Sequence, residues 1–346
     1  MFYEIHTAII FSIFACNFQK KVYFINHQKY NLMRRRDFFK SAALVGLATV
    51  VKTTAFGSTL SSSAKNPAIS NSAPDLVAVM GGEPEAMLLR ALKEFGGIKT
   101  FVKKGQKVVI KPNIGWDRTP ELAANTNPEL VSALVKQCKL AGASEVLVFD
   151  HTCHDWKKSY SNSGIEAAVN AAGGKMVPGN DESFYREVEI PNGIKMTSNK
   201  IHQAILDCDV WFNVPILKHH GGAKNSISMK NLMGIVWDRK FFHKNDLHQC
   251  IADIATSHKK PALNIVDAYR IMKSNGPQGK SEADVVLLKS LIISPDFVAA
   301  DTAALKMFSQ VQPTDIKDVR HIELAEKAHV GTMNLESLNV KRIKMN

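Results

Sequence analysis

The chain has 346 residues, of which 45% are hydrophobic and 22% are charged, and its formal net charge is +12. A chain of this length and composition can bury a full hydrophobic core, which excludes an intrinsically disordered protein. Residues 1–64 contain eight Lys or Arg and two acidic residues, so they account for half of the net charge. The rest of the chain has no basic stripe interleaved with aromatic residues, which argues against nucleic-acid binding and favours a small anionic partner.

The segment 33–64 has the layout of a twin-arginine (Tat) signal peptide. Arg35 and Arg36 are followed by a modest apolar run over residues 41–51, which is the pattern that this export signal requires. The apolar run is too short to span a bilayer. We therefore expect the twin-arginine translocation machinery as a partner, a periplasmic location, and no stable membrane span in the mature protein.

Two further segments flank this signal peptide. Met33 directly precedes the arginines, so residues 1–32 are interpreted as an over-extended gene start or as a second apolar segment. Small residues end the signal peptide near Ala64, and the polar stretch 65–74 is expected to be a linker. The remaining residues, 75–346, are expected to form a single compound α/β domain.

Short apolar runs without alternation predict strands that are covered on both faces of a sheet. These runs are 76–80, 107–111, 145–150, 210–214, 263–267 and 290–294. Between them, apolar periodicity and helix-start residues predict helices over 83–95, 127–141, 163–172, 247–257, 297–308 and 316–329. This alternation indicates an α/β fold, namely a three-layer, doubly wound, largely parallel sheet with helices on both faces. Two alternating runs around Pro191-Asn192-Gly193 predict an inserted β-hairpin over 186–196.

Polar side chains follow several of these strands, and open α/β sheets bind ligands at the carboxyl ends of their strands. Lys111 and Asn113 close the strand 107–111 and would present a cation and an amide donor to a ligand. The alternative is a solvated lysine before a turn.

A second polar group closes the strand 145–150. His151 and His154 lie there between Asp150 and Asp155. A His-x-x-His pair with carboxylates is typical of divalent-metal ligation, whereas in a loop the same residues would be ordinary polar surface. The candidate metal ligands are His151, His154, His220 and His243.

The densest polar cluster is 215–234, directly after a predicted strand. Lys218 and His220 would supply a fixed charge and a group that exchanges protons near neutral pH. Three further residues in this cluster suit a bound phosphate or carboxylate: Ser228, Lys230 and Asn231. An ordinary loop rich in lysine and serine is the alternative.

His243 and Asp267 complete the predicted site. His243 precedes the helix 247–257 and is a candidate for proton transfer, and Asp267 would orient a histidine or lysine or act as a base. The turn-rich residues 275–279 would cap the site. Asp296, by contrast, is interpreted mainly as a helix cap.

The cysteines of the mature chain are widely spaced and form no C-x-x-C pair: Cys138, Cys153, Cys208 and Cys250. The sequence therefore contains neither a zinc knuckle nor a ferredoxin-type iron–sulfur motif. Cys138 and Cys208 lie in apolar contexts that are typical of buried free thiols.

A series of short motifs, taken in order, resembles the family catalogued as domain of unknown function 362. The motifs are Lys111-Pro112-Asn113, Asn127-Pro128-Glu129, Ala141-Gly142-Ala143, Asp150, Gly164-Ile165, Pro215-x-Leu217-Lys218-x-His220, Lys230-Asn231-x-x-Gly234, His243, Asp267, Gly276-Pro277-x-Gly279 and Asp296. The resemblance covers about residues 75–310. It implies redox or metal-linked chemistry and a redox partner, because members of that family often accompany ferredoxin modules. This sequence has no such module, and the family supplies no settled reaction.

The leading hypothesis is an exported enzyme that acts on a small anionic substrate, a carboxylate or a phosphate, at the carboxyl edge of the sheet. His220 or His243 would transfer a proton while lysine and asparagine side chains bind the anion. The second hypothesis is a non-catalytic periplasmic binding protein for an anionic ligand or a metal. The two differ in whether a bound ligand is chemically changed.

Overall fold

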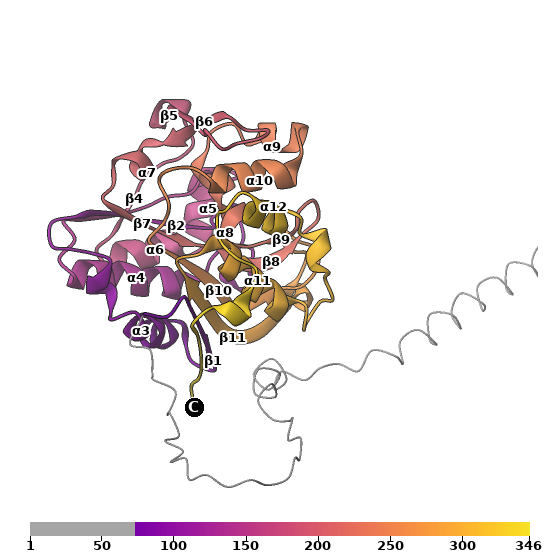
Figure 1. The fold of residues 1–346 in the computed structure, drawn as a ribbon. Helices are drawn as coiled ribbons and strands as arrows, with labels where there is room; N and C mark the ends of the chain where they lie inside the picture. The colour runs from indigo at the N-terminus through magenta and orange to yellow at the C-terminus, as the bar shows by residue number, and fades with distance from the viewer. Residues whose placement is uncertain (1–72) are drawn as a thin grey trace, which may run out of the picture. The chain divides into compact units, whose positions relative to one another are not determined.

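The computed structural model describes residues 73–346, so the predicted gene start, the signal peptide and most of the linker lie outside the described residues. A ten-stranded sheet forms the centre of the fold (Figure 1). Eight strands follow the order β12-β1-β11-β10-β7-β2-β3-β4, and β8 and β9 extend from β10. Their bounds are β1 (Leu76–Met80), β2 (Lys107–Pro112), β3 (Glu145–Val148), β4 (Lys175–Met176), β7 (Val210–Val214), β8 (Ile216–His220), β9 (Lys224–Ser226), β10 (Leu263–Met272), β11 (Val285–Ser294) and β12 (Val340–Lys344).

The sheet is largely parallel, as the sequence predicts. Strands β10, β7, β2, β3 and β4 each run parallel to the next one. Only β11, which pairs antiparallel with β1 and β10, and β9, which pairs antiparallel with β8, run against this direction among the described strands. The parallel half therefore brings the carboxyl ends of β7, β2 and β3 to one edge of the sheet.

Helices cover both faces of the sheet, which confirms the predicted three-layer α/β fold (Figure 1). Along β2, Val108 and Ile110 pack into one apolar cluster and Val109 into the other. The first face is covered by α3 (Pro84–Glu94), α4 (Pro128–Leu140), α5 (Trp156–Asn162) and α6 (Ile165–Ala171). The second face is covered by α7 (Gln203–Asp207), α8 (Ser228–Asn231), α9 (Lys240–Lys244), α10 (Leu247–Ala255), α11 (Phe297–Phe308) and α12 (His321–Lys327).

Helix starts agree with the capping residues in the sequence. The Asn127 side chain accepts a hydrogen bond from the Glu129 amide, and Pro128 occupies the first turn of α4, where its missing N–H costs nothing. Asp296 caps α11 by accepting from the amides of Val298 and Ala299, as the interpretation of this residue as a cap expects.

The inserted hairpin is present, but its second strand lies further along the chain than predicted. Strand β5 (Tyr185–Glu189) pairs with β6 (Ser198–His202), whereas the prediction ends at residue 196. The Asp253 carboxylate of α10 accepts hydrogen bonds from the amides of Lys195 (2.7 Å) and Met196 (2.9 Å). These amides are therefore tied to α10 and cannot pair with β5.

Strands β10 and β11 are each ten residues long, twice the predicted length. They pair with one another along almost their full length, with an irregularity between Ala268 and Arg270. The described residues all belong to one compact unit. Within them, no helix combines the length and apolar character needed to cross a membrane.

Candidate functional site

A cavity of about 420 Å³ opens at the carboxyl edge of the parallel strands. We call it the anion cavity, because lysine and arginine side chains outnumber carboxylates in its lining. Predicted site residues in its lining are Lys111, Asn113, His151, Lys218, His220, Lys230, Asn231 and His243. Other residues in its lining are Gly115, Trp116, Asp150, Cys153, Ser226, Met233, Gly234, Arg239, Lys240 and Pro277. The sheet and the segment 216–243 thus bring most of the predicted site together.

A buried ion pair forms the floor of this cavity. The Nζ atom of Lys111 lies 2.9 Å from Oδ1 of Asp150, and both side chains are almost completely inaccessible. Burial lowers the pKa of Lys111, and the Asp150 charge opposes this effect. Lys111 also donates to the backbone oxygen (2.7 Å) and to Oδ1 (2.8 Å) of Asn231. Lys111 is therefore compensated by a carboxylate and held by further acceptors.

Gly234 packs directly against this ion pair. A Cβ atom built on Gly234 would lie 1.8 Å from Oδ1 of Asp150 and 2.5 Å from Nζ of Lys111. Any side chain at this position would displace the pair, because real Cβ atoms do not approach other atoms so closely. The absence of a side chain at residue 234 is therefore a requirement of the site.

A chain of buried amides fixes the strand ends relative to one another. The Asn231 side chain donates to Oδ1 of Asn213 in β7 (2.9 Å) and accepts from the Asn113 amide group (3.1 Å). Asn213 in turn donates to Oδ1 of Asn264 in β10 (2.9 Å). With these bonds and those to Lys111, Asn231 holds other site residues in place, and its direct contact with a ligand stays a prediction.

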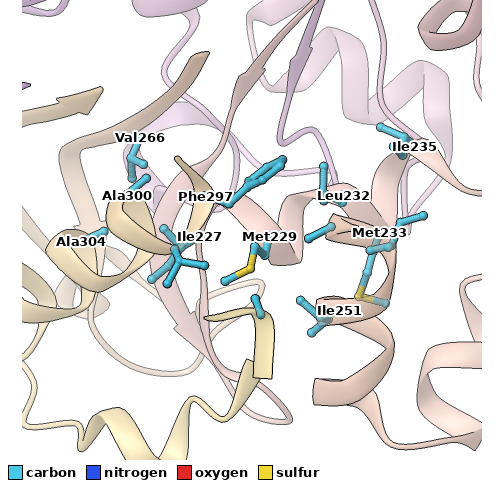
Figure 2. Packing of buried hydrophobic residues seen from close by; sticks show 14 of the residues in the cluster. Ile227, Met229, Leu232, Met233, Ile235, Ile251, Val266, Phe297, Ala300 and Ala304 are labelled. Atoms are coloured by element: carbon cyan, nitrogen blue, oxygen red, sulfur yellow. The ribbon is translucent and has the colours of Figure 1, made fainter. Parts of the chain in front are cut away.

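The segment that carries Lys230 is anchored by apolar side chains on the second face of the sheet. Met229, Leu232 and Met233 belong to the cluster that also contains Ile251 of α10 and Phe297 of α11. Figure 2 shows these side chains gathered between the ribbon segments. Lys230 is thus placed at the cavity by a short helix whose apolar residues are buried in the core.

Lys218 and Lys230 reach the cavity without a carboxylate partner. Among the described residues, neither Nζ atom has a carboxylate oxygen within 4.0 Å. Lys218 donates to Oδ1 of Asn113 (3.0 Å) and to the backbone oxygen of Ala124, which are neutral acceptors. The Nζ atom of Lys230 lies 3.3 Å from the sulfur of Met233.

The pKa values of both lysines are lowered. Burial lowers the pKa of Lys218 to about 7, and the charges of Lys230 and Lys111 add to the effect. Burial lowers the pKa of Lys230 to about 8, and Arg239 and Lys111 add to it. Each lysine therefore exchanges a proton near neutral pH, and each would regain its positive charge beside a bound anion.

Arg239 adds a third cation that has no carboxylate partner in the described part of the chain. Its guanidinium donates to the backbone oxygens of His151 (2.8 Å) and Thr152 (2.7 Å), and to the Cys153 sulfur (3.1 Å). These bonds hold the loop after β3 against the segment 237–240. Among residues 73–346, Asp150 is the single carboxylate that lines the cavity, and it is already paired with Lys111.

The two best-placed histidines are neutral and differ in tautomer. Nδ1 of His220 accepts hydrogen bonds from the amides of Gly222 and Ala223, both at 3.1 Å, so its proton must lie on Nε2. Nδ1 of His151 lies 2.9 Å from the Val236 oxygen and must carry the proton there, which leaves Nε2 as an acceptor. Burial lowers the pKa of His220 far below its usual range and that of His151 to about 4.

Three predicted site residues lie elsewhere. Asp267 is buried and accepts from the amides of Asn127 (2.8 Å) and Tyr269 (2.9 Å), so it joins α4 to β10. Ser228 is buried at the start of α8, where its amide donates to Asp301 (2.7 Å). Nδ1 of His154 accepts from an amide at 3.3 Å, and its ring packs on Trp116.

Several residues in the cavity lining are not among the predicted site residues. Asp150 lies at the end of a predicted strand. The rule that ligands bind at the carboxyl ends of strands, which indicates Lys111, applies equally to Asp150. Cys153 is the one exposed cysteine among those that the structure describes, whereas Cys138 and Cys208 are buried and free, as expected. Arg239 has no local signal, because its contacts lie more than eighty residues away along the chain.

The candidate metal ligands do not form a coordination group. His154 lies outside the cavity lining, and Nδ1 of His220 is already bonded to two amides. In the part of the chain from residue 73 onward, no three His, Cys, Asp or Glu side chains are placed to hold a metal ion.

Comparisons with known proteins identify a relative, a solved structure and a family to which this chain is similar. The chain is 25% identical over 224 residues to thylakoid-associated protein sll1697 of Synechocystis, which covers 62% of this chain and 67% of that protein. The solved lactate racemase apoprotein from Thermoanaerobacterium thermosaccharolyticum is 14% identical with a TM-score of 0.43. That match covers 68% of this chain, which spans 57% of the racemase chain. The family described as domain of unknown function (DUF362) matches residues 108–306, more than half of the chain, so this protein belongs to that family.

Proposed function

We propose that this protein is an enzyme that binds a small anionic substrate, a phosphate or a carboxylate, in the anion cavity. The observation that carries the proposal is the pair Lys218 and Lys230, which line the cavity without a carboxylate partner among the described residues. Buried cations are normally paired, because an unpaired charge is costly to bury. A bound anion would supply the missing partner.

The cavity residues divide into two roles under this proposal. Lys218, Lys230 and Arg239 neutralise the charge of the anion, and the Nε2–H of His220 donates a hydrogen bond to it. The buried Lys111–Asp150 pair and Asn231 keep these groups in position. No carboxylate in the lining is free to repel the anion.

Proton exchange is assigned to Lys218. A side chain whose pKa lies near the working pH can both donate and accept a proton at a small cost in free energy. The pKa of Lys218 is about 7. His220 is less suited, because its Nδ1 is bonded to two amides. A non-catalytic binding protein would not require a lysine with this pKa, and product formation from a saturating ligand separates the two functions.

Calorimetric titration with sulfate and malonate tests the binding step. We expect Lys218→Met and Lys230→Met each to weaken anion binding about 10- to 100-fold, because each removes a charge-assisted contact. The matched control is Lys139→Met, since Lys139 is exposed at the end of α4 and lies outside the cavity. Equal affinity of all variants and the unmodified protein would refute the proposal.

Export and metal use complete the proposal. The twin arginines Arg35 and Arg36 support export through the twin-arginine machinery to the periplasm, and cell fractionation of an Arg35→Lys/Arg36→Lys variant tests it. The family resemblance supports a metal ion or a redox partner. Elemental analysis of purified protein, with His151→Ala and His243→Ala variants, tests whether a stoichiometric metal is bound.

A further inference from the structure

A second, larger cavity of about 670 Å³ lies next to the anion cavity. We call this the outer cavity. His151, Arg239 and Lys240 line both cavities, so the two adjoin at these three residues. A ligand that fills the anion cavity could therefore extend past these side chains into the outer cavity.

The outer cavity lies between the β5–β6 hairpin and the segment 237–241. Ser198, Asn199 and Lys200 line it from β6. The Trp237 amide donates to the Lys200 oxygen at 2.9 Å, which attaches the segment to the edge of the hairpin. The inserted hairpin therefore supplies one wall of this cavity.

The outer cavity has an aromatic side. The rings of Trp237 and His151 stack with a centroid separation of 5.0 Å and an interplanar angle of 2°, so His151 already covers one face of Trp237. The part of Trp237 that lines the outer cavity is the surface that a ligand ring would contact. Phe241 also lines the cavity. Aromatic side chains of this kind bind the flat faces of planar rings by offset stacking.

The charges of the outer cavity are balanced, unlike those of the anion cavity. Its three carboxylates, Glu182, Glu187 and Asp238, match its three cations, Lys200, Arg239 and Lys240. Glu182 and Lys200 are already paired at 2.5 Å. The outer cavity therefore suits the uncharged part of a ligand rather than a second anion.

The volumes also favour a ligand larger than a simple anion. A cavity of 420 Å³ is already in the range that holds an organic ligand, and an inorganic phosphate or a two-carbon acid fills little of it. The adjoining outer cavity adds space that such an anion would not use.

We propose that the ligand is an organic phosphate or carboxylate whose body ends in a planar ring, with the anionic group in the anion cavity and the ring against Trp237. This inference rests on the proposed function, because it takes the anion cavity as the site of the charged group.

Titration calorimetry with matched phosphate monoesters tests this inference. The ring-bearing probes are phenyl phosphate, 2-phenylethyl phosphate and adenosine 5′-monophosphate, and the ringless probe is propyl phosphate. We expect at least one ring-bearing probe to bind about tenfold more tightly than propyl phosphate. Trp237→Ala should remove this gain and leave the affinity for propyl phosphate unchanged, whereas Trp237→Phe should retain part of it.

The matched control is Trp156→Ala, since Trp156 lies in α5 and lines neither cavity. A thermal melt of each variant shows that it is folded. The inference is overturned if no ring-bearing probe gains over propyl phosphate, or if Trp237→Ala weakens all probes equally. Failure of propyl phosphate, inorganic phosphate, sulfate and malonate to bind at all would instead overturn the proposed function.

Discussion

Close packing and ion pairing fix the positions of several side chains at the cavity. Lys111 and Asp150 neutralise one another below the cavity, and Gly234 leaves the space that this pair occupies. Lys218 and Lys230 lack such a carboxylate partner among residues 73–346. The site therefore separates a structural lysine, Lys111, from two lysines that are available to a ligand.

Gly234→Ala should destabilise the protein by about 3 kcal/mol, because the new Cβ would break the buried Lys111–Asp150 pair. Urea unfolding measures this loss. Gly221→Ala is the control, since the nearest atom to a Cβ at Gly221 is 4.0 Å away, and its effect should stay within about 0.5 kcal/mol. Equal effects of the two substitutions would show that the pair does not depend on Gly234.

At the scale of elements, the carboxyl ends of the parallel strands and the inserted hairpin build the two cavities. Strands β2, β3 and β7 lie side by side, so residues that follow them meet although they are far apart in sequence. The hairpin is held in place by α10, because the Asp253 carboxylate accepts hydrogen bonds from the amides of Lys195 and Met196. The outer cavity therefore depends on a contact between α10 and the hairpin loop.

Asp253→Asn should loosen this loop, because an amide group would replace one of the oxygens that accept from Lys195, Met196 and Gln249. We expect a stability loss of about 1–3 kcal/mol and faster hydrogen exchange of residues 190–197. Asp315→Asn is the control: Asp315 is an exposed cap, and asparagine caps a helix equally well. Unchanged exchange in Asp253→Asn would contradict this role of α10.

Strand and helix patterns predict much of the fold because apolar runs and caps are local signals. The strand 210–214 and the helix 297–308 have the predicted bounds. Short elements such as β8, β9 and α9 are not predicted, because their formation depends on pairing or packing with distant segments.

The candidate site also contains residues that local patterns predict and residues that only tertiary contacts place there. Residues next to predicted strand ends, such as Lys111 and Asn113, do line the cavity. Asp267 is predicted as a strand end, yet β10 continues to Met272 by pairing with β11, which leaves Asp267 inside the strand. Arg239 and Trp237 reach their cavities through tertiary contacts that no local pattern indicates.

At the scale of the whole molecule, the unpaired lysines couple stability, pH and ligand binding. Lys218 has a pKa of about 7 in the folded protein, compared with 10.5 for an ordinary lysine. Between pH 7 and pH 10.5 this lysine binds more protons in the unfolded chain than in the folded protein. The free energy of unfolding therefore decreases as the pH falls from 10.5 to 7. A bound anion would raise the pKa of Lys218 and Lys230 and so reverse part of that cost.

The most direct test of this account is calorimetric titration with sulfate at pH 8 in two buffers of different ionisation enthalpy. Sulfate does not titrate at this pH, so any proton taken up is bound by the protein. Because binding raises the pKa of Lys218 and Lys230, we predict net proton uptake, with affinity falling as the pH rises through 7 to 9. Sulfate binding without proton uptake, or no binding at all, would contradict the account.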